Sequence, residues 1–183
     1  MSLDSKTALR LQFLVRVVLK ECDHLLLTDT RLFAEPFTEK RAKLLAVDPD
    51  LAERVEAFVS RFSRLQDTLG DKLLPTLLMA LGEKTGAAID NLDRAERLGF
   101  ILSVDEWLAM RNLRNQMVNE YVEDLLVLSS ALQSAHGFVS ALLTVTQAIT
   151  AEVERRGWLV RLTQHIETSK NAQIFVIPAK AGI

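Results

Sequence analysis

The chain has 183 residues, of which 49% are hydrophobic and 25% are charged, as in an ordinary soluble globular domain. Its single cysteine, Cys22, excludes an intramolecular disulfide framework and any multi-cysteine zinc or iron–sulfur site. The 22 basic and 24 acidic residues leave a net charge of -2, so no broad positive field attracts nucleic acid and any RNA contact has to be local.

Composition also bears on fold class and location. Apolar runs such as Leu77 to Leu81 are far shorter than the ~20 residues that span a bilayer, and early charged residues interrupt any signal-peptide core. We therefore predict a cytoplasmic protein without a membrane-spanning segment. The 7 glycines, 4 prolines and 6% aromatic residues are too few for an all-β chain. The prediction is an all-α, up-and-down bundle of about five or six helices with a non-helical C-terminal tail.

The first predicted helix runs from about Lys6 to Thr28 and ends at Thr28-Asp29-Thr30. Its apolar residues alternate at spacings of four and three, which forms one buried stripe and makes Cys22 a small core residue. The stripe consists of Leu11, Val15, Val18, Cys22 and Leu25. A short helix follows, capped by Thr38 and ending near Leu45.

Asp48-Pro49 predicts the start of the longest regular segment, because the carboxylate can cap orphan N–H groups and proline is tolerated at the first helical position. The same alternating spacing continues through Leu51, Val55, Phe58, Phe62, Leu65, Leu69, Leu73 and Leu77. Such a stripe suits the seam of a bundle or a helix–helix dimer contact. Pro75 lies within it and removes a backbone donor, so a kink or break is expected between Asp71 and Leu74.

Later helices are expected after a connection at Gly82 to Gly86. The first, from Ile89 to Gly99, should present one face made of Ile89, Leu92, Ala95 or Glu96, and Gly99. Ser103 and Glu106 have capping-box spacing and open a second helix, in which Trp107 and Met110 are assigned to the core. After Tyr121 the helical pattern covers 122–132, weakens at His136-Gly137, and resumes over 138–156.

The chain is thereby predicted to divide into a helical bundle, 1–157, and a C-terminal extension, 158–183, that is partly disordered. The extension has no helical period, and its apolar run from Ile174 to Ile177 precedes a proline. The alternative is a strand added to an edge or a partner.

One helical segment carries more polar order than a bundle requires. Arg111 and Arg114 are three residues apart, while Asn115 and Asn119 are four apart on one helical face, so guanidinium and amide groups crowd one surface. Tyr121 follows directly. The three histidines lack partner ligands at useful spacing, so neither a metal nor a cofactor is expected.

This segment resembles the HEPN superfamily, and within it the bacterial HepT-like toxins and the substrate-binding subunits of minimal nucleotidyltransferases. The family signature is an arginine, usually followed by asparagine, then a histidine a few residues later and often a tyrosine two positions on. Arg114, Asn115 and Tyr121 match it, whereas Asn119 stands where the histidine is expected. The resemblance implies a HEPN-like domain over 1–157, a homodimer, and a metal-independent endoribonuclease site at the dimer interface, within a toxin–antitoxin or nucleotidyltransferase-partner module.

Asn119 makes that ribonuclease site degenerate. A carboxamide does not titrate near neutral pH and cannot act as a general base, a role worth ~10²–10⁴ in rate. Arg114 and Asn119 are thus the remnants of the catalytic pair, Arg111 and Asn115 are candidate RNA- or nucleotide-binding residues, and weak or absent nuclease activity is predicted. The resemblance further implies that Tyr121 is an acceptor for modification by a nucleotidyltransferase antitoxin.

Two alternatives stay open. In one, the chain is a non-catalytic subunit that binds a nucleotide, another substrate or a partner protein. In the other it is a plain helical dimerisation protein, and Arg114 is an ordinary ion-paired residue with Glu120 or Asp124 as its partner.

Overall fold

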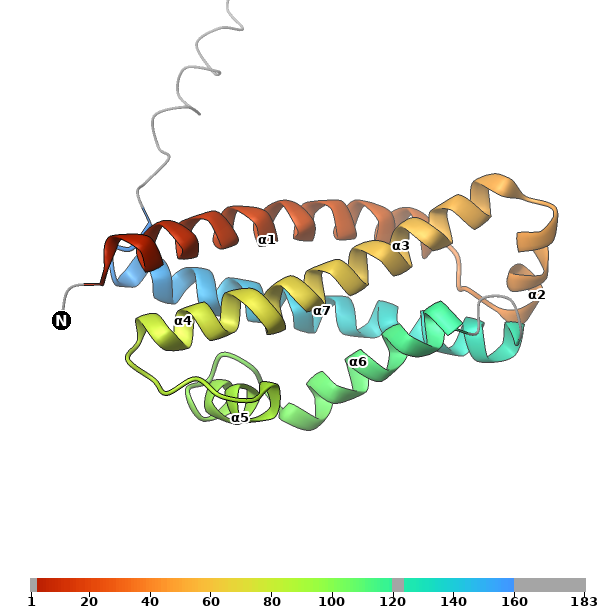
Figure 1. Cartoon of the computed structure of the whole chain (residues 1–183). Coiled ribbons are helices and arrows are strands. Elements are labelled where there is room, and N and C mark those ends of the chain that lie inside the picture. The colour runs from red at the N-terminus through yellow and green to blue at the C-terminus, as the bar shows by residue number, and fades with distance from the viewer. Residues whose placement is uncertain (1–2, 120–123, 160–183) are drawn as a thin grey trace, which may run out of the picture.

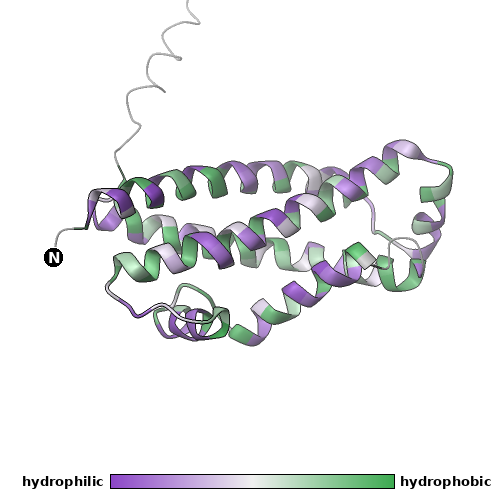
Figure 2. Cartoon of the chain, viewed as in Figure 1, coloured by the Kyte–Doolittle hydropathy of each residue, from purple (hydrophilic) through white to green (hydrophobic). Residues whose placement is uncertain are grey.

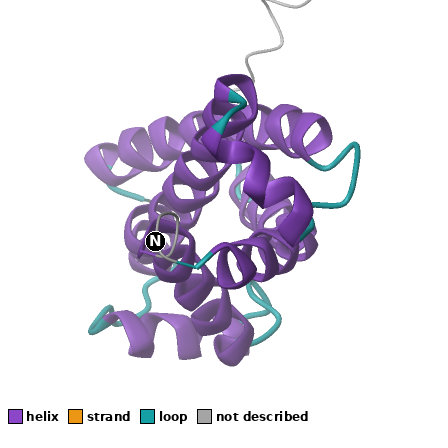
Figure 3. Ribbon diagram, turned by 90° about the vertical axis from the view of Figure 1, so that its right-hand side faces the viewer, coloured by secondary structure: helices purple, strands orange, loops and turns teal. Residues whose placement is uncertain are grey.

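The computed structural model describes residues 3–119 and 124–159, and within them every regular element is helical (Figures 1 and 3). The elements are α1 (Ser5–Leu32), α2 (Glu39–Ala42), η1 (Lys43–Ala46), α3 (Pro49–Asp67), η2 (Thr68–Leu73), α4 (Leu74–Ala80), α5 (Ala88–Arg97), α6 (Val104–Asn119) and α7 (Leu125–Arg155). The predicted all-α bundle is confirmed for this part of the chain.

Four long segments form the bundle and run alternately up and down (Figure 1). Helix α1 packs against α3 and α7, and α6 packs against the same two helices, so the four close into a ring. Helix α2 sits in the first connection and contacts α7, while α5 sits in the second and contacts α4. Short connections between antiparallel neighbours are the expected topology for such a bundle.

The two predicted apolar stripes supply much of the core. Every member of the α1 stripe is buried, and so is every member of the stripe from Leu51 to Leu77. Hydrophobic residues recur in this way along each long helix (green in Figure 2). Helix α1 is longer than predicted: it continues past Thr28-Asp29-Thr30 to Leu32.

Helix starts follow the predicted capping residues. The Asp48 carboxylate accepts a hydrogen bond from the Leu51 amide at 2.9 Å, with Pro49 in the first turn. Ser103 Oγ accepts from the Glu106 amide at 3.3 Å. A second donor at this end, the Val104 amide, bonds to the Glu96 carboxylate of α5 at 2.7 Å.

Pro75 has the predicted local effect without ending the helix. Because proline lacks an amide donor and its ring crowds the carbonyl four residues earlier, the chain widens into the π-helical segment η2 directly before it. In this wider turn the Leu74 amide bonds to the Leu69 carbonyl, five residues back.

Two predictions about the later helices are wrong. Helix α7 passes through His136 and Gly137 without a break, because His136 is anchored by the carboxylate of Asp29 on α1 and Gly137 needs no unusual backbone angle. In α5 the buried face consists of Asn91, Leu92 and Ala95, while Ile89 is exposed. Asn91 is buried because its side chain bonds to both backbone groups of Gly86.

Helix α7 is also long and apolar enough to cross a membrane, judged by length and composition alone. The core helix of a bundle passes the same test, and one face of α7 is buried against α1 and α6. After Gly157, which has a positive φ that ends the helix, Trp158 turns back toward α1, where its carbonyl accepts from Gln12 Nε2 at 2.9 Å. The predicted extension, 158–183, lies outside the described part of the chain from residue 160 onward, while Trp158 and Leu159 pack against the core.

Two glycines make a matched test of the packing. A Cβ at Gly70 would lie 2.8 Å from Cζ2 of Trp107, whereas a Cβ at Gly137 meets nothing within 4 Å. Gly70→Ala should therefore destabilise the fold by about 1–3 kcal/mol through overpacking. Gly137→Ala should stabilise it by about 0.5–1 kcal/mol, because glycine is a poor helix former. Urea unfolding measures both, and equal effects would contradict the predicted packing of Trp107.

Candidate functional site

The polar segment singled out in the sequence occupies the second half of α6, facing α3 and η2. Arg111 and Arg114 are half-buried at this helix contact, while Asn115 is exposed to solvent. Asn119 is the last residue of α6; its side chain lies outside the described part of the chain, as does Tyr121. The structure thus brings the two arginines together and leaves Asn115 off the contact.

Both arginines are bound by aspartates of the neighbouring segment. Arg111 Nη2 donates to both carboxylate oxygens of Asp71 at 3.1 Å each. Arg114 Nη2 lies 3.1 Å from Asp67 Oδ2. The sequence suggested Glu120 or Asp124 as an ion-pair partner of Arg114. The observed partner is Asp67 of α3, because α3 and α6 are antiparallel neighbours.

The contact between Trp107 and Gly70 sets this register. Trp107 is 2% exposed, and its indole ring packs on the backbone where Gly70 has no side chain. Its carbonyl accepts from the buried Gln66 Nε2 at 3.4 Å. Asp67 lies about one helical turn before Gly70 and Arg114 two turns after Trp107, and the long arginine side chain reaches the carboxylate.

Beyond the ion pairs, α3, η2 and α6 border an open groove of about 620 Å³. Its apolar part is formed by Val59, Met117 and Val118, and the last of these is 58% exposed. Its polar lining consists of Glu56, Ser60, Ser63, Arg64, Asp67, Thr68, Lys72 and Arg114. An apolar wall with a few charged groups around it is the usual make-up of a small-molecule site.

Charge in the groove is not fully compensated within the chain. In the described residues, neither Arg64 nor Lys72 has a carboxylate within 4 Å; Arg64 Nη2 only donates to Ser60 Oγ at 3.4 Å. Ser63 lines the groove, and its buried Oγ has no hydrogen-bond partner among the described residues. The groove therefore offers two cations, with an unpartnered hydroxyl beneath its surface.

Glu21 of α1 adds a partly buried carboxylate near Thr68, Arg64 and Lys72. Burial raises its pKa, an effect that a hydrogen bond from Thr68 and the nearby positive charges of Arg64 and Lys72 partly oppose. One carboxylate oxygen, Oε2, is buried and has no hydrogen-bond partner in the part of the chain that the structure describes. Burial thus disfavours the charged form of Glu21, which lowers the stability of the folded state when this carboxylate is ionised.

The remaining reactive side chains lie elsewhere. His136 Nδ1 is 2.7 Å from Asp29 Oδ1, and its ring stacks on Phe33 with centroids 4.2 Å apart. Cys22 is a core residue, as predicted; burial raises its pKa, and its thiol donates to Thr146 Oγ1. Among the described residues no histidine lines the groove, and no three His, Cys, Asp or Glu side chains are grouped to hold a metal ion.

Sequence reasoning missed Asp67, Asp71, Arg64 and Lys72. Part of the signal was present, since Arg64, Thr68 and Lys72 recur at spacings of four and share a helical face. Nothing local identifies the aspartates as partners of Arg111 and Arg114. That pairing depends on which helix lies beside α6.

No protein-family model, curated protein or solved structure matches this chain. The HEPN resemblance of the segment from Arg114 to Tyr121 therefore stays a prediction. The described contacts of Arg114 and the groove beside it are the grounds on which function can be argued.

The Arg114–Asp67 pair can be measured by a double-mutant cycle of Arg114→Ala and Asp67→Ala. The two side chains are 34% and 33% exposed, so solvent screens them and a coupling of about 0.2–1 kcal/mol is expected. Urea unfolding of the four proteins gives this value. A coupling of zero would mean that the guanidinium is free in solution, contrary to the described geometry.

Glu21→Gln should make stability less dependent on pH. Because the pKa of Glu21 is raised on folding, the folded state binds the proton more tightly, and stability falls as pH rises above the ordinary carboxyl pKa of about 4.3. The variant should therefore be more stable than the parent at neutral pH, with the gain disappearing in acid. The control is Asp23→Asn, an exposed site on the same helix; an equal gain there would contradict the assignment.

Proposed function

We propose that this chain is a HEPN-like binding subunit of a toxin–antitoxin or nucleotidyltransferase-partner module, and that its groove binds a nucleotide without cleaving RNA. The observation that carries the proposal is the ion pair between Arg114 and Asp67 at the edge of a groove whose described lining contains no histidine. Of the hypotheses left open by the sequence, this favours the non-catalytic one over the degenerate ribonuclease.

The chemistry of RNA cleavage explains the preference. Cleavage needs a general base for the 2′-hydroxyl and a cation free to stabilise the charge that develops on the phosphate. Asn119 cannot serve as the base. Arg114 already shares its charge with Asp67 in the same chain, so less of it is available to a phosphate.

The make-up of the groove favours a nucleotide. Its volume of about 620 Å³ is within the usual range for small-molecule sites, roughly 300–1,000 Å³. A base and ribose can cover Val59, Met117 and Val118, while Arg64 and Lys72 are cations suited to the phosphate. The Ser63 hydroxyl is a further polar group without a partner.

The contacts within the described residues do not bear on the partners, location or modification of the chain. The homodimer, the cytoplasmic location, the nucleotidyltransferase antitoxin and the modification of Tyr121 remain predictions from the sequence and its HEPN resemblance. They would supply the setting in which a nucleotide-binding subunit acts.

Calorimetric titration with AMP, adenosine and inorganic phosphate tests the binding function. AMP should bind at least tenfold more tightly than phosphate, because the base covers the apolar wall. Val118→Asp should remove that difference, and Arg64→Gln combined with Lys72→Gln should weaken AMP but not adenosine. The matched control, Arg16→Gln with Lys20→Gln, removes the same charge from the exposed side of α1. AMP binding no better than phosphate would overturn the proposal.

The same protein should leave structured RNA uncut, and Asn119→His should leave it uncut as well. Cleavage that is lost in Arg114→Ala would restore the ribonuclease hypothesis. Gel analysis of the RNA distinguishes the two outcomes.

A further inference from the structure

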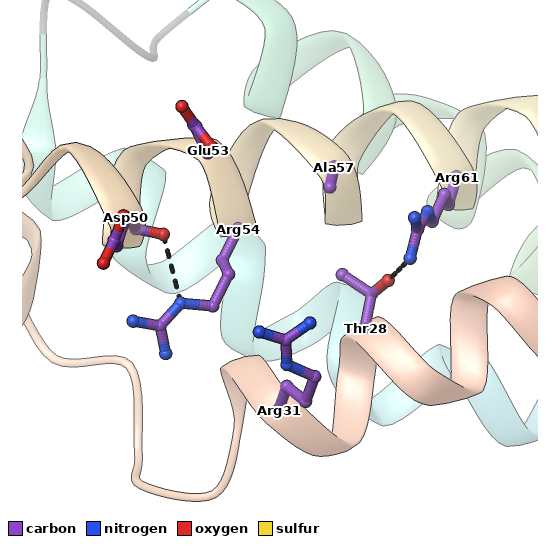
Figure 4. Close-up of a pocket in the computed structure, with 7 residues that line it drawn as sticks. All are labelled: Thr28, Arg31, Asp50, Glu53, Arg54, Ala57 and Arg61. Carbon is purple, nitrogen blue, oxygen red and sulfur yellow. Dashed lines mark hydrogen bonds between the residues drawn. The ribbon is translucent and has the colours of Figure 1, made fainter.

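A second basic site lies between α3 and α1 and shares no lining residue with the groove of the proposed function. Arg31 of α1 and Arg54 and Arg61 of α3 line a pocket of about 480 Å³ (Figure 4). The other lining residues are Thr28, Asp50, Glu53 and Ala57. None of these residues lines the groove between α3 and α6.

Helix geometry explains how three arginines meet here. Arg54, Ala57 and Arg61 are spaced three and four residues apart on α3 and therefore share one face. Thr28 and Arg31 share a face of the antiparallel α1, which packs against α3. Ala57 has a small side chain, which leaves space between the longer arginines.

Only one of the three guanidiniums is tied to the neighbouring helix. Arg61 Nη1 donates to the His24 carbonyl at 3.0 Å and to Thr28 Oγ1. Arg54 uses only its Nε, which donates to the Asp50 carbonyl of its own helix at 3.1 Å, so its two terminal nitrogens stay available. Over residues 3–119 and 124–159, Arg31 makes no side-chain hydrogen bond.

Within the described residues this cluster forms no ion pair, although Asp50 and Glu53 also line the pocket. In the described part of the chain, none of the three arginines has a carboxylate oxygen within 4 Å, whereas Arg111, Arg114, Arg155 and Arg156 each have one. Figure 4 shows the Glu53 side chain directed away from the guanidiniums. The Arg31 and Arg54 side chains extend from opposite helices into the space between α1 and α3 (Figure 4). Like charges gathered in this way create a local positive potential that favours an anion.

We propose that this pocket binds a phosphoryl group, held chiefly by Arg31 and Arg54. The planar guanidinium presents paired N–H donors that match two phosphate oxygens, and two such groups from facing helices can hold one phosphate from both sides. Arg61 supplies further positive charge while it keeps α1 and α3 in register. The phosphoryl group can come from free phosphate or pyrophosphate, from a nucleotide, or from an RNA backbone, and these sources share the same chemistry.

The test is a calorimetric titration of the full chain with pyrophosphate at low salt. The pocket variant, Arg31→Gln with Arg54→Gln, should bind pyrophosphate at least tenfold more weakly than the parent. The groove variant, Arg64→Gln with Lys72→Gln, and the charge-matched variant, Arg16→Gln with Lys20→Gln, should keep the parent affinity. Arg61 is left unchanged because it ties the two helices together, and thermal unfolding verifies that each variant folds.

The outcomes separate this proposal from the proposed function. Loss confined to the pocket variant supports a phosphoryl site between α1 and α3, even where AMP binding in the groove fails. Equal loss in the pocket and charge-matched variants, or no pyrophosphate binding by the parent, overturns it. Competition by ATP and by a single-stranded RNA oligonucleotide then identifies the source: displacement by ATP alone assigns a nucleotide, and displacement by RNA alone assigns a nucleic-acid backbone.

Discussion

The close packing of Trp107 against the backbone at Gly70 is the constraint on which the rest of the α3–α6 contact depends. An indole ring can approach a helix this closely only where a side chain is missing, and a Cβ at Gly70 would lie 2.8 Å from the ring. The contact falls within the π-helical turn that Pro75 imposes. The same contact between α6 and the α3–η2 segment carries two ion pairs, Arg111 with Asp71 and Arg114 with Asp67.

Helix α3 then serves two surfaces at once. Its buried stripe faces the core, one flank borders α6 and the groove, and the other borders α1 and the arginine pocket. Arg61 and Arg64 are three residues apart and are therefore neighbours on the surface of α3, yet each lines a different site. The two basic sites share this scaffold helix but have no lining residue in common.

The arginines of this protein have different structural roles, and the groups that surround each arginine decide its role. Arg111 and Arg114 are neutralised by aspartates and hold α6 to α3 and η2. Arg61 joins α1 to α3 through a backbone carbonyl and a hydroxyl, neither of which cancels its charge. Arg31 and Arg54 have no carboxylate oxygen within 4 Å among the described residues, so no ion pair cancels their positive charge in the pocket.

Features that depend on neighbours along the chain were open to prediction from the sequence. The two buried stripes, the Asp48-Pro49 and Ser103 helix starts, and the disturbance before Pro75 all depend on residues within one or two helical turns. The identification of Trp107 as a core residue succeeded for the same reason. Where a long-range contact competes with a local signal the prediction failed, as at Gly137, where the contact of His136 with α1 accompanies an unbroken helix.

The partners of Arg114, the groove and the arginine pocket bring together residues that are tens of positions apart. Such pairings depend on which helices are neighbours and at what height they cross, and no local pattern of residues encodes either.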